Sequence, residues 1–136
     1  MRDQRGTITI WVLGLTVAVL FLGGLGVDLW HAIAVRREVS LMADTAATAG
    51  ANGLDESALR GGRLQLDADR VRTLVAAQLA EYPSAAHLAG EVVSIDGDRV
   101  TVVLQERVRF SLLGIFMPGR HFTVQATATA EPEEIP

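Results

Sequence analysis

The side chains best suited to chemistry in this sequence are three histidines and a few carboxylates. His31, His87 and His121 stand far apart, and none lies at helical metal-binding spacing from another histidine or carboxylate. Asp96-Gly97-Asp98 could open a calcium loop, but the remaining oxygen ligands of such a loop are missing, so we interpret it as a turn. We therefore expect no metal site and no cofactor.

Other reactive groups are also lacking. The chain has no cysteine, which excludes disulfides, thiolate metal sites and cysteine nucleophiles. It contains no glycine-rich phosphate loop, nucleophile elbow or metalloprotease motif. Asp69 and Glu81 are too far apart to act as a catalytic pair. We expect no enzyme activity and no small-molecule substrate, and the net charge of −4 leaves no basic face for nucleic acid.

The stretch that must position everything else is residues 7–27, TITIWVLGLTVAVLFLGGLGV, which carries no charge. Twenty-one helical residues extend roughly 31 Å, the hydrocarbon thickness of a bilayer. A chain of 136 residues is too small to bury so apolar a helix in a core of its own. The sequence therefore predicts a single transmembrane anchor, with the lipid bilayer as its first partner.

The charges beside this span favour an amino terminus inside the cell and a carboxyl terminus outside. Residues 1–6 include Arg2 and Arg5, and a basic tail tends to remain cytoplasmic. Arg36 and Arg37 on the far side weaken the asymmetry. The alternative is a signal peptide cleaved after Ala34, but the apolar run is longer than such peptides usually have.

The helix is predicted to continue beyond the membrane, because residues 28–49 contain neither proline nor glycine. Gly50 and Gly53 then provide a stop signal, so we assign residues 28–53 to this extension. Small and apolar residues recur along it at spacings of three and four, which indicates a packing stripe for a partner helix or for the chain's own domain. The stripe consists of Ala32, Val35, Val39, Met42, Ala46 and Ala49.

An ordered set of features here resembles a known family. It comprises Arg5-Gly6, the uncharged span, Asp28, Arg36-Arg37 and the run MADTAATAGA over residues 42–51. This set resembles the tight-adherence (Tad) pilus-assembly proteins, and within them the TadE/TadG-like pseudopilins, especially the short actinobacterial forms. The resemblance implies a single-pass subunit of a Tad/Flp-type pilus or related secretion machine, held in the cytoplasmic membrane or incorporated into a cell-surface pilus. Its implied partners are other pilus subunits, contacted by helix packing.

The resemblance also suggests a candidate cleavage position at Gly6. In pseudopilins of this type a prepilin peptidase cuts after a glycine that is followed five positions later by glutamate. Here the fifth residue after Gly6 is Trp11. This departure favours a subunit that keeps its first residues and serves as an assembly component.

Residues 54–130 are expected to form a small α+β domain outside the membrane. A short helical turn is closed by Gly61-Gly62, and a second helix follows from Asp67 to Pro83. We interpret residues 83–90 as a loop. Antiparallel strands are predicted over 91–95, 99–110 and 121–130, giving a pilin-like three-stranded sheet beneath the two helices. The acidic residues 131–136 are expected to be disordered.

An unusually apolar loop separates the last two predicted strands, where a hairpin tip should be polar. Its apolar residues are Leu112, Leu113, Ile115, Phe116 and Met117. The loop either contacts the bilayer or a neighbouring subunit, or folds over the end of the sheet to complete a thin core.

Two functions from different classes fit these features. The first is a pseudopilin-like structural subunit that associates through its anchor and the 28–49 helix. The second is a membrane-tethered or secreted binding module that recognises its ligand through loops of the small domain.

Overall fold

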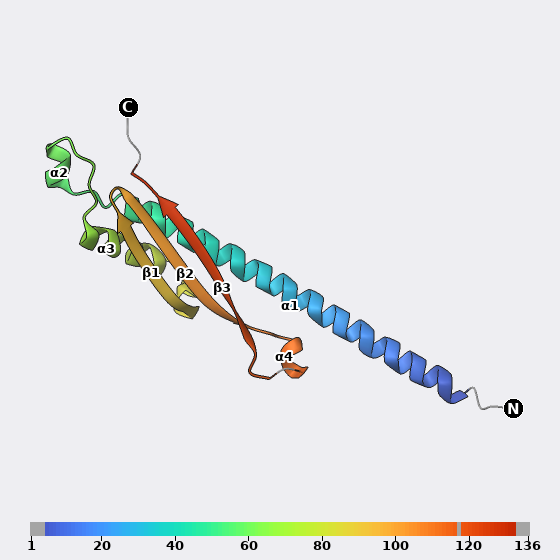
Figure 1. Cartoon of the computed structure of the whole chain (residues 1–136). Coiled ribbons are helices and arrows are strands. Elements are labelled where there is room, and N and C mark those ends of the chain that lie inside the picture. Colours follow the sequence, from blue (N-terminus) through green and yellow to red (C-terminus); the bar gives the residue numbers. More distant parts are fainter. Residues whose placement is uncertain (1–4, 117, 133–136) are drawn as a thin grey trace.

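The computed structural model describes residues 5–116 and 118–132, and of residues 5, 6, 113 and 116 it describes the backbone only. The chain forms one long helix, α1 (Arg5–Ala51), with a small α+β domain packed along its second half (Figure 1). The 47 residues of α1 extend roughly 70 Å. The predicted fold class, with a long apolar helix, a further helix and a three-stranded antiparallel sheet, is confirmed.

The sheet contains β1 (Leu88–Asp96), β2 (Arg99–Arg109) and β3 (His121–Ala130) in the order β1-β2-β3, all antiparallel. A two-residue turn joins β1 to β2, and Gly97 adopts a φ of 64° there. Glycine tolerates this left-handed conformation without the steric cost that a side chain would bring. The turn interpretation of residues 96–98 agrees with this geometry.

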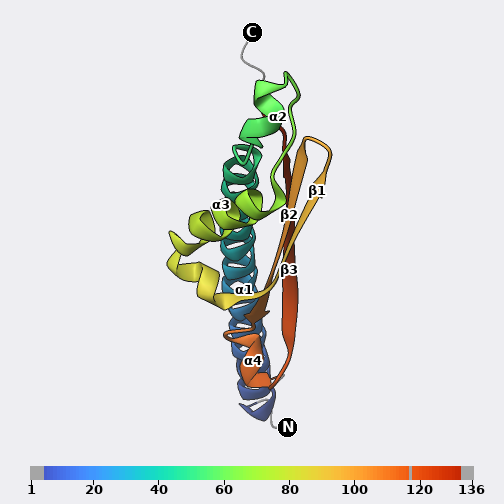
Figure 2. The ribbon, with the colours of Figure 1, turned by 90° about the vertical axis from the view of Figure 1, so that its left-hand side faces the viewer.

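Helices α1 and α3 (Ala68–Ala80) cover the same face of the sheet (Figure 2). Alternate residues of β2 and β3 point into the resulting two-layer core, where Leu104 and Met42 are fully buried. The other face of the sheet carries threonine and glutamine side chains, and Gln105 donates to Gln125 at 3.2 Å across the strands. Such alternation is typical of an antiparallel sheet with one open face.

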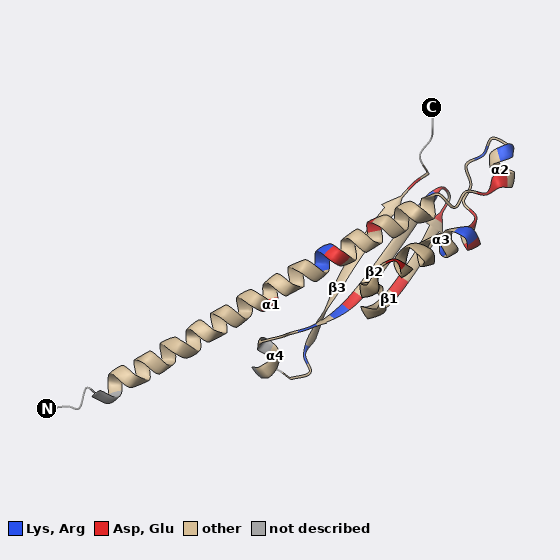
Figure 3. Cartoon of the chain, turned by 180° about the vertical axis from the view of Figure 1, so that it is seen from behind, with Lys and Arg blue, Asp and Glu red and all other residues tan. Residues whose placement is uncertain are grey.

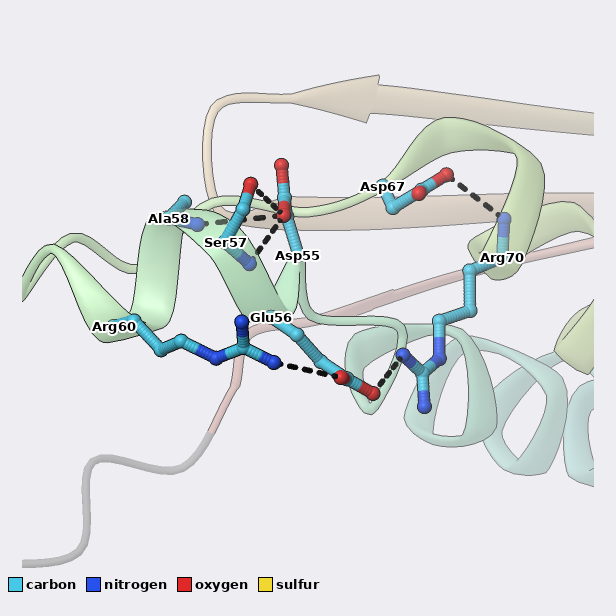
Figure 4. Close-up of polar contacts among 7 residues, drawn as sticks. All are labelled: Asp55, Glu56, Ser57, Ala58, Arg60, Asp67 and Arg70. Carbon is cyan, nitrogen blue, oxygen red and sulfur yellow. Dashed lines mark hydrogen bonds and ion pairs between the residues drawn. The ribbon is translucent and has the colours of Figure 1, made fainter.

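Helix α3 begins where the sequence predicts it. The side chain of Asp67 accepts hydrogen bonds from the backbone N–H groups of Asp69 and Arg70, at 2.9 and 3.1 Å. This N-cap satisfies donors that the first helical turn leaves unpaired. Asp55 caps the short helix α2 (Glu56–Arg60) in the same way (Figure 4).

An ion pair joins these two capped helices at the end of the domain far from residues 7–27. Glu56 accepts a hydrogen bond from Arg70 at 2.9 Å and lies 3.8 Å from Arg60, so α2 is bridged to α3 (Figure 4). Both ion pairs are exposed, so each adds little to stability.

The predicted boundaries differ most from the structure between residues 83 and 91. The expected loop over residues 83–90 is instead a 3-10 helix, η1 (Pro83–His87), followed directly by β1. Proline at the first helical position has its φ angle already set for a helical turn. β1 begins early because β2 is long enough to pair Glu106 with Leu88.

The end of the chain is described only at Glu131 and Pro132, and residues 133–136 of the expected acidic tail lie outside the described residues. Arg99 donates two hydrogen bonds to Glu131, one of them from Nε at 2.8 Å. The first residue of the tail is thus held to the start of β2.

Candidate functional site

The small-residue stripe of the extended helix lies against the chain's own domain. Val39, Met42 and Ala46 are fully buried in the core, and Val35 packs against its edge. Ala32 and Ala49 are partly exposed at the two ends of the stripe. A second helix therefore has no access to the middle of this face.

A different apolar face of α1 is exposed beyond the anchor. Trp30, Ile33 and Leu41 have exposed fractions of 74%, 43% and 54%. A shallow groove of about 370 Å³ runs along this face, and Arg37 and Glu38 also line it. The residues at 30, 33, 37 and 41 follow the same three-four spacing as the buried stripe, so the signal was present in the sequence. It was missed because the charged residue at 37 interrupts it.

Asp28 connects the end of the anchor to the loop between β2 and β3. The residue is 5% exposed, and its carboxylate accepts hydrogen bonds from the backbone N–H groups of Ser111 and Leu112, at 2.8 and 3.1 Å. One turn earlier in the helix, Gly24 also contacts the loop. A Cβ at that position would lie 3.3 Å from the Cβ of Leu112, so glycine allows this close approach.

The apolar loop contains a short helix, α4 (Leu113–Phe116), that lies beside α1 on the side of the anchor (Figure 1). Leu112 and Ile115 are 42% and 72% exposed. The side chains of Leu113 and Phe116 and the whole of Met117 lie outside the described residues. At the root of the loop the rings of Phe110 and Phe122 pack with their centroids 5.4 Å apart.

One half-buried carboxylate points from the sheet towards the helices. Burial raises the pKa of Glu106, and the nearby negative charge of Glu38 raises it further, whereas His87 and His31 lower it. Within the described part of the chain, no three His, Asp or Glu side chains gather as metal ligands would.

Residues 6–80 match a family model described as putative Flp pilus-assembly TadE/G-like, which covers more than half of the chain. The chain belongs to this family. Comparison with curated proteins and with solved structures gives no match. The resemblance noted in residues 5–51 is thereby confirmed, and membership supports a role in Tad/Flp pilus assembly together with other pilus components.

In this TadE/G-like protein, α1 is long and apolar enough to cross a membrane, with a mean hydropathy of 2.3 over its most apolar window. That window is 6% buried, so it does not form the core of a soluble domain. Together with the family, the helix indicates a membrane-anchored protein. The family is one of structural pilus-assembly components, and nothing in the described residues indicates catalysis.

Gly6, the candidate processing position of the TadE/G-like protein, lies in the first turn of α1, directly after Arg5. The helix continues through Trp11 and Ala34 without interruption. Cleavage after Ala34 would remove Asp28 and with it the hydrogen bonds that hold the Ser111–Leu112 backbone.

Proposed function

We propose that this TadE/G-like protein is a pseudopilin-like structural subunit of a Tad/Flp-type pilus or a related secretion machine. In this proposal residues 7–27 cross the cytoplasmic membrane once, with residues 1–6 inside the cell. Residues 28–53 project outward and carry the 54–130 domain on the outer side. The protein acts by helix packing and catalyses no reaction.

The observation that carries the proposal is that the two halves of α1 have different surroundings. Its first half is an apolar rod, and its second half has one face covered by the domain and another apolar face left exposed at Trp30, Ile33 and Leu41. An apolar face that continues an anchor suits lateral packing against the helices of neighbouring subunits. The buried stripe, by contrast, fixes the domain to the helix.

The charged residues of the projecting helix agree with this arrangement. Residues 7–27 contain no charged residue and are tan in Figure 3, and the charged residues that follow on the helix are Asp28 and then Arg36, Arg37 and Glu38. Arg37 and Glu38, beside the exposed face, could pair with charges on a neighbouring helix, which would fix the register between subunits.

The test replaces the exposed apolar residues by arginine in the native cell. Ile33→Arg and Leu41→Arg should abolish co-purification with the other pilus components and prevent pilus formation. The thermal stability of the purified chain should stay unchanged, because both side chains point away from the core. The matched control is Thr127→Arg, on the open face of the sheet.

The opposite pattern would support the alternative of a tethered binding module. If Thr127→Arg or changes in the domain loops block function while Ile33→Arg and Leu41→Arg do not, the small domain recognises a ligand directly. The structural-subunit proposal would then be wrong, although the family and the anchor would stand.

A further inference from the structure

The apolar loop lies beside the end of the apolar span of α1 rather than beside the core of the soluble domain. Leu112 contacts Gly24, a residue inside the apolar span, and its backbone is held by Asp28 at the end of that span. Asp28 is four positions after Gly24, which corresponds to about 6 Å along a helix. If the span is in lipid, the loop must therefore lie within the outer part of the same lipid layer.

Two tryptophans give an independent estimate of where the bilayer ends. Trp11 and Trp30 are 76% and 74% exposed, and tryptophan is enriched at both membrane–water boundaries. Trp30 is nineteen positions after Trp11, so the two lie about 28 Å apart along the helix, close to the hydrocarbon thickness of a bilayer. Gly24 and its contact with Leu112 then lie about 9 Å inside the boundary marked by Trp30.

The chain around the loop has the charge that a phospholipid surface attracts. Residues 107–130 contain three arginines and no aspartate or glutamate, although the whole chain has a net charge of −4. Arg109 ends β2 and Arg120 directly precedes β3, so they flank the loop on its two arms (Figure 3). Both are exposed, and no ion pair involves them among the residues described.

We propose that the loop at residues 112–116 is a second membrane contact, with Ile115 in the outer part of the acyl layer and Arg109 and Arg120 on lipid phosphates. This proposal rests on the proposed function in one respect only, namely that residues 7–27 cross the membrane. Apolar residues at the boundary with flanking basic side chains are the pattern of interfacial membrane insertion. The carboxylate of Asp28 allows this placement, because backbone N–H groups left unpaired in lipid are costly.

This second contact limits how the domain moves. A single helix crossing a bilayer leaves a domain free to tilt and to rotate about the helix axis. A loop inserted beside the helix, and bonded to it at Asp28, gives the domain one defined orientation on the membrane. Trp30, Ile33 and Leu41 would then face sideways along the membrane surface in every copy.

The chain lacks cysteine, so single cysteines can carry a fluorescent label without background. We would reconstitute three full-length variants, Ile115→Cys, Leu20→Cys and Leu59→Cys, into dilute phosphatidylcholine vesicles with or without phosphatidylglycerol. Lipids with a nitroxide on the acyl chain quench labels in the bilayer, and iodide quenches labels in water. Leu20 reports the anchor, and Leu59, an exposed apolar residue on α2, reports the far end of the domain.

We expect the label at position 115 to be quenched several-fold more by shallow nitroxide lipids than the label at position 59, and to be protected from iodide. Quenching should increase with phosphatidylglycerol, and Arg109→Gln with Arg120→Gln should abolish that increase. Equal quenching in both vesicles would overturn the role of the arginines.

Iodide access at position 115 as great as at position 59, with lipid quenching intact at position 20, would overturn the insertion while leaving the anchor. Protection from iodide that develops only at high protein density would mean that a neighbouring subunit covers the loop. This outcome would also overturn the proposed membrane insertion. Loss of lipid quenching at position 20 would instead contradict the anchor and the proposed function together.

Discussion

Asp28 and Ser111 are 83 residues apart in the chain, yet the carboxylate of the first accepts the backbone N–H of the second at 2.8 Å. The contact joins the end of the membrane anchor to the tip of the β2–β3 hairpin. It fixes the position of α4 relative to the anchor, independently of the core farther along α1. The acidic residue after the span thus has a defined structural role.

Removing this carboxylate should release the loop and leave the core intact. In Asp28→Ala, hydrogen exchange at the amides of Ser111 and Leu112 should accelerate about ten- to hundredfold, because hydrogen bonds to a charged group contribute about 1.5–3 kcal/mol. Asp28→Asn keeps a carbonyl acceptor and should have an intermediate effect. Asp44→Ala, an exposed position on the same helix, is the control, and equal protection in all four proteins would contradict the prediction.

Met42 and Leu41 are consecutive residues of α1, but only Met42 faces the core, so they should respond differently to truncation. Met42 is fully buried and Leu41 is 54% exposed. Met42→Ala should lower the free energy of unfolding by about 2–5 kcal/mol. Leu41→Ala should change it by less than about 0.5 kcal/mol. Chemical denaturation of the full chain in detergent measures both values, and equal losses would mean that the two faces are wrongly assigned.

Glu106 should make the stability of the domain depend on pH. Burial raises its pKa above the ordinary value of 4.5, with Glu38 adding to the shift and His87 and His31 opposing it. The folded chain therefore holds this proton more tightly than the unfolded chain, and stability falls as the pH rises from 4.5 through the raised pKa.

Glu106→Gln removes this titration while keeping the shape of the side chain. The variant should melt at a higher temperature than the native chain at neutral pH, and this advantage should disappear as the pH falls below 4.5. Thermal melts across this range, with Glu91→Gln on the exposed side of β1 as the matched control, provide the comparison. An advantage that persists at low pH would show that burial of the charge is not its cause.

The protein isolated from its native membrane should retain the residues before Thr7. Trp11 occupies the position where the resemblance to pseudopilins calls for glutamate, so processing after Gly6 is not expected. Intact-mass measurement and amino-terminal sequencing identify the first residue of the isolated protein. A chain that starts at Thr7 would contradict this expectation and favour entry into a filament. A start at Val35 would mean that the anchor is a cleaved signal peptide.

The architecture was predictable because its signals are local. The uncharged span, the cap at Asp67 and the alternation along β3 each follow from neighbouring residues, and all three appear in the structure. The early start of β1 was missed because it depends on the length of its partner strand rather than on its own composition.

The candidate site was harder to predict, because it depends on contacts between distant residues. The sequence showed that Asp28 follows the anchor and that residues 112–117 are apolar, but nothing local joins the two. The same limit applies to the stripe at Val39 and Met42. Its spacing indicates a packing face, whereas the identity of its partner depends on where β2 and β3 lie.

β3 follows the other described elements in the chain and packs on α1, so the packing around this early helix is completed only by residues 121–130. Until residues 121–130 have been synthesised, Val39 and Met42 lack part of their cover beside the membrane. A chain interrupted before β3 would present that uncovered apolar surface to proteases and chaperones. The order of synthesis thus provides a quality check, since the second half of α1 is fully covered only in a chain that extends through β3.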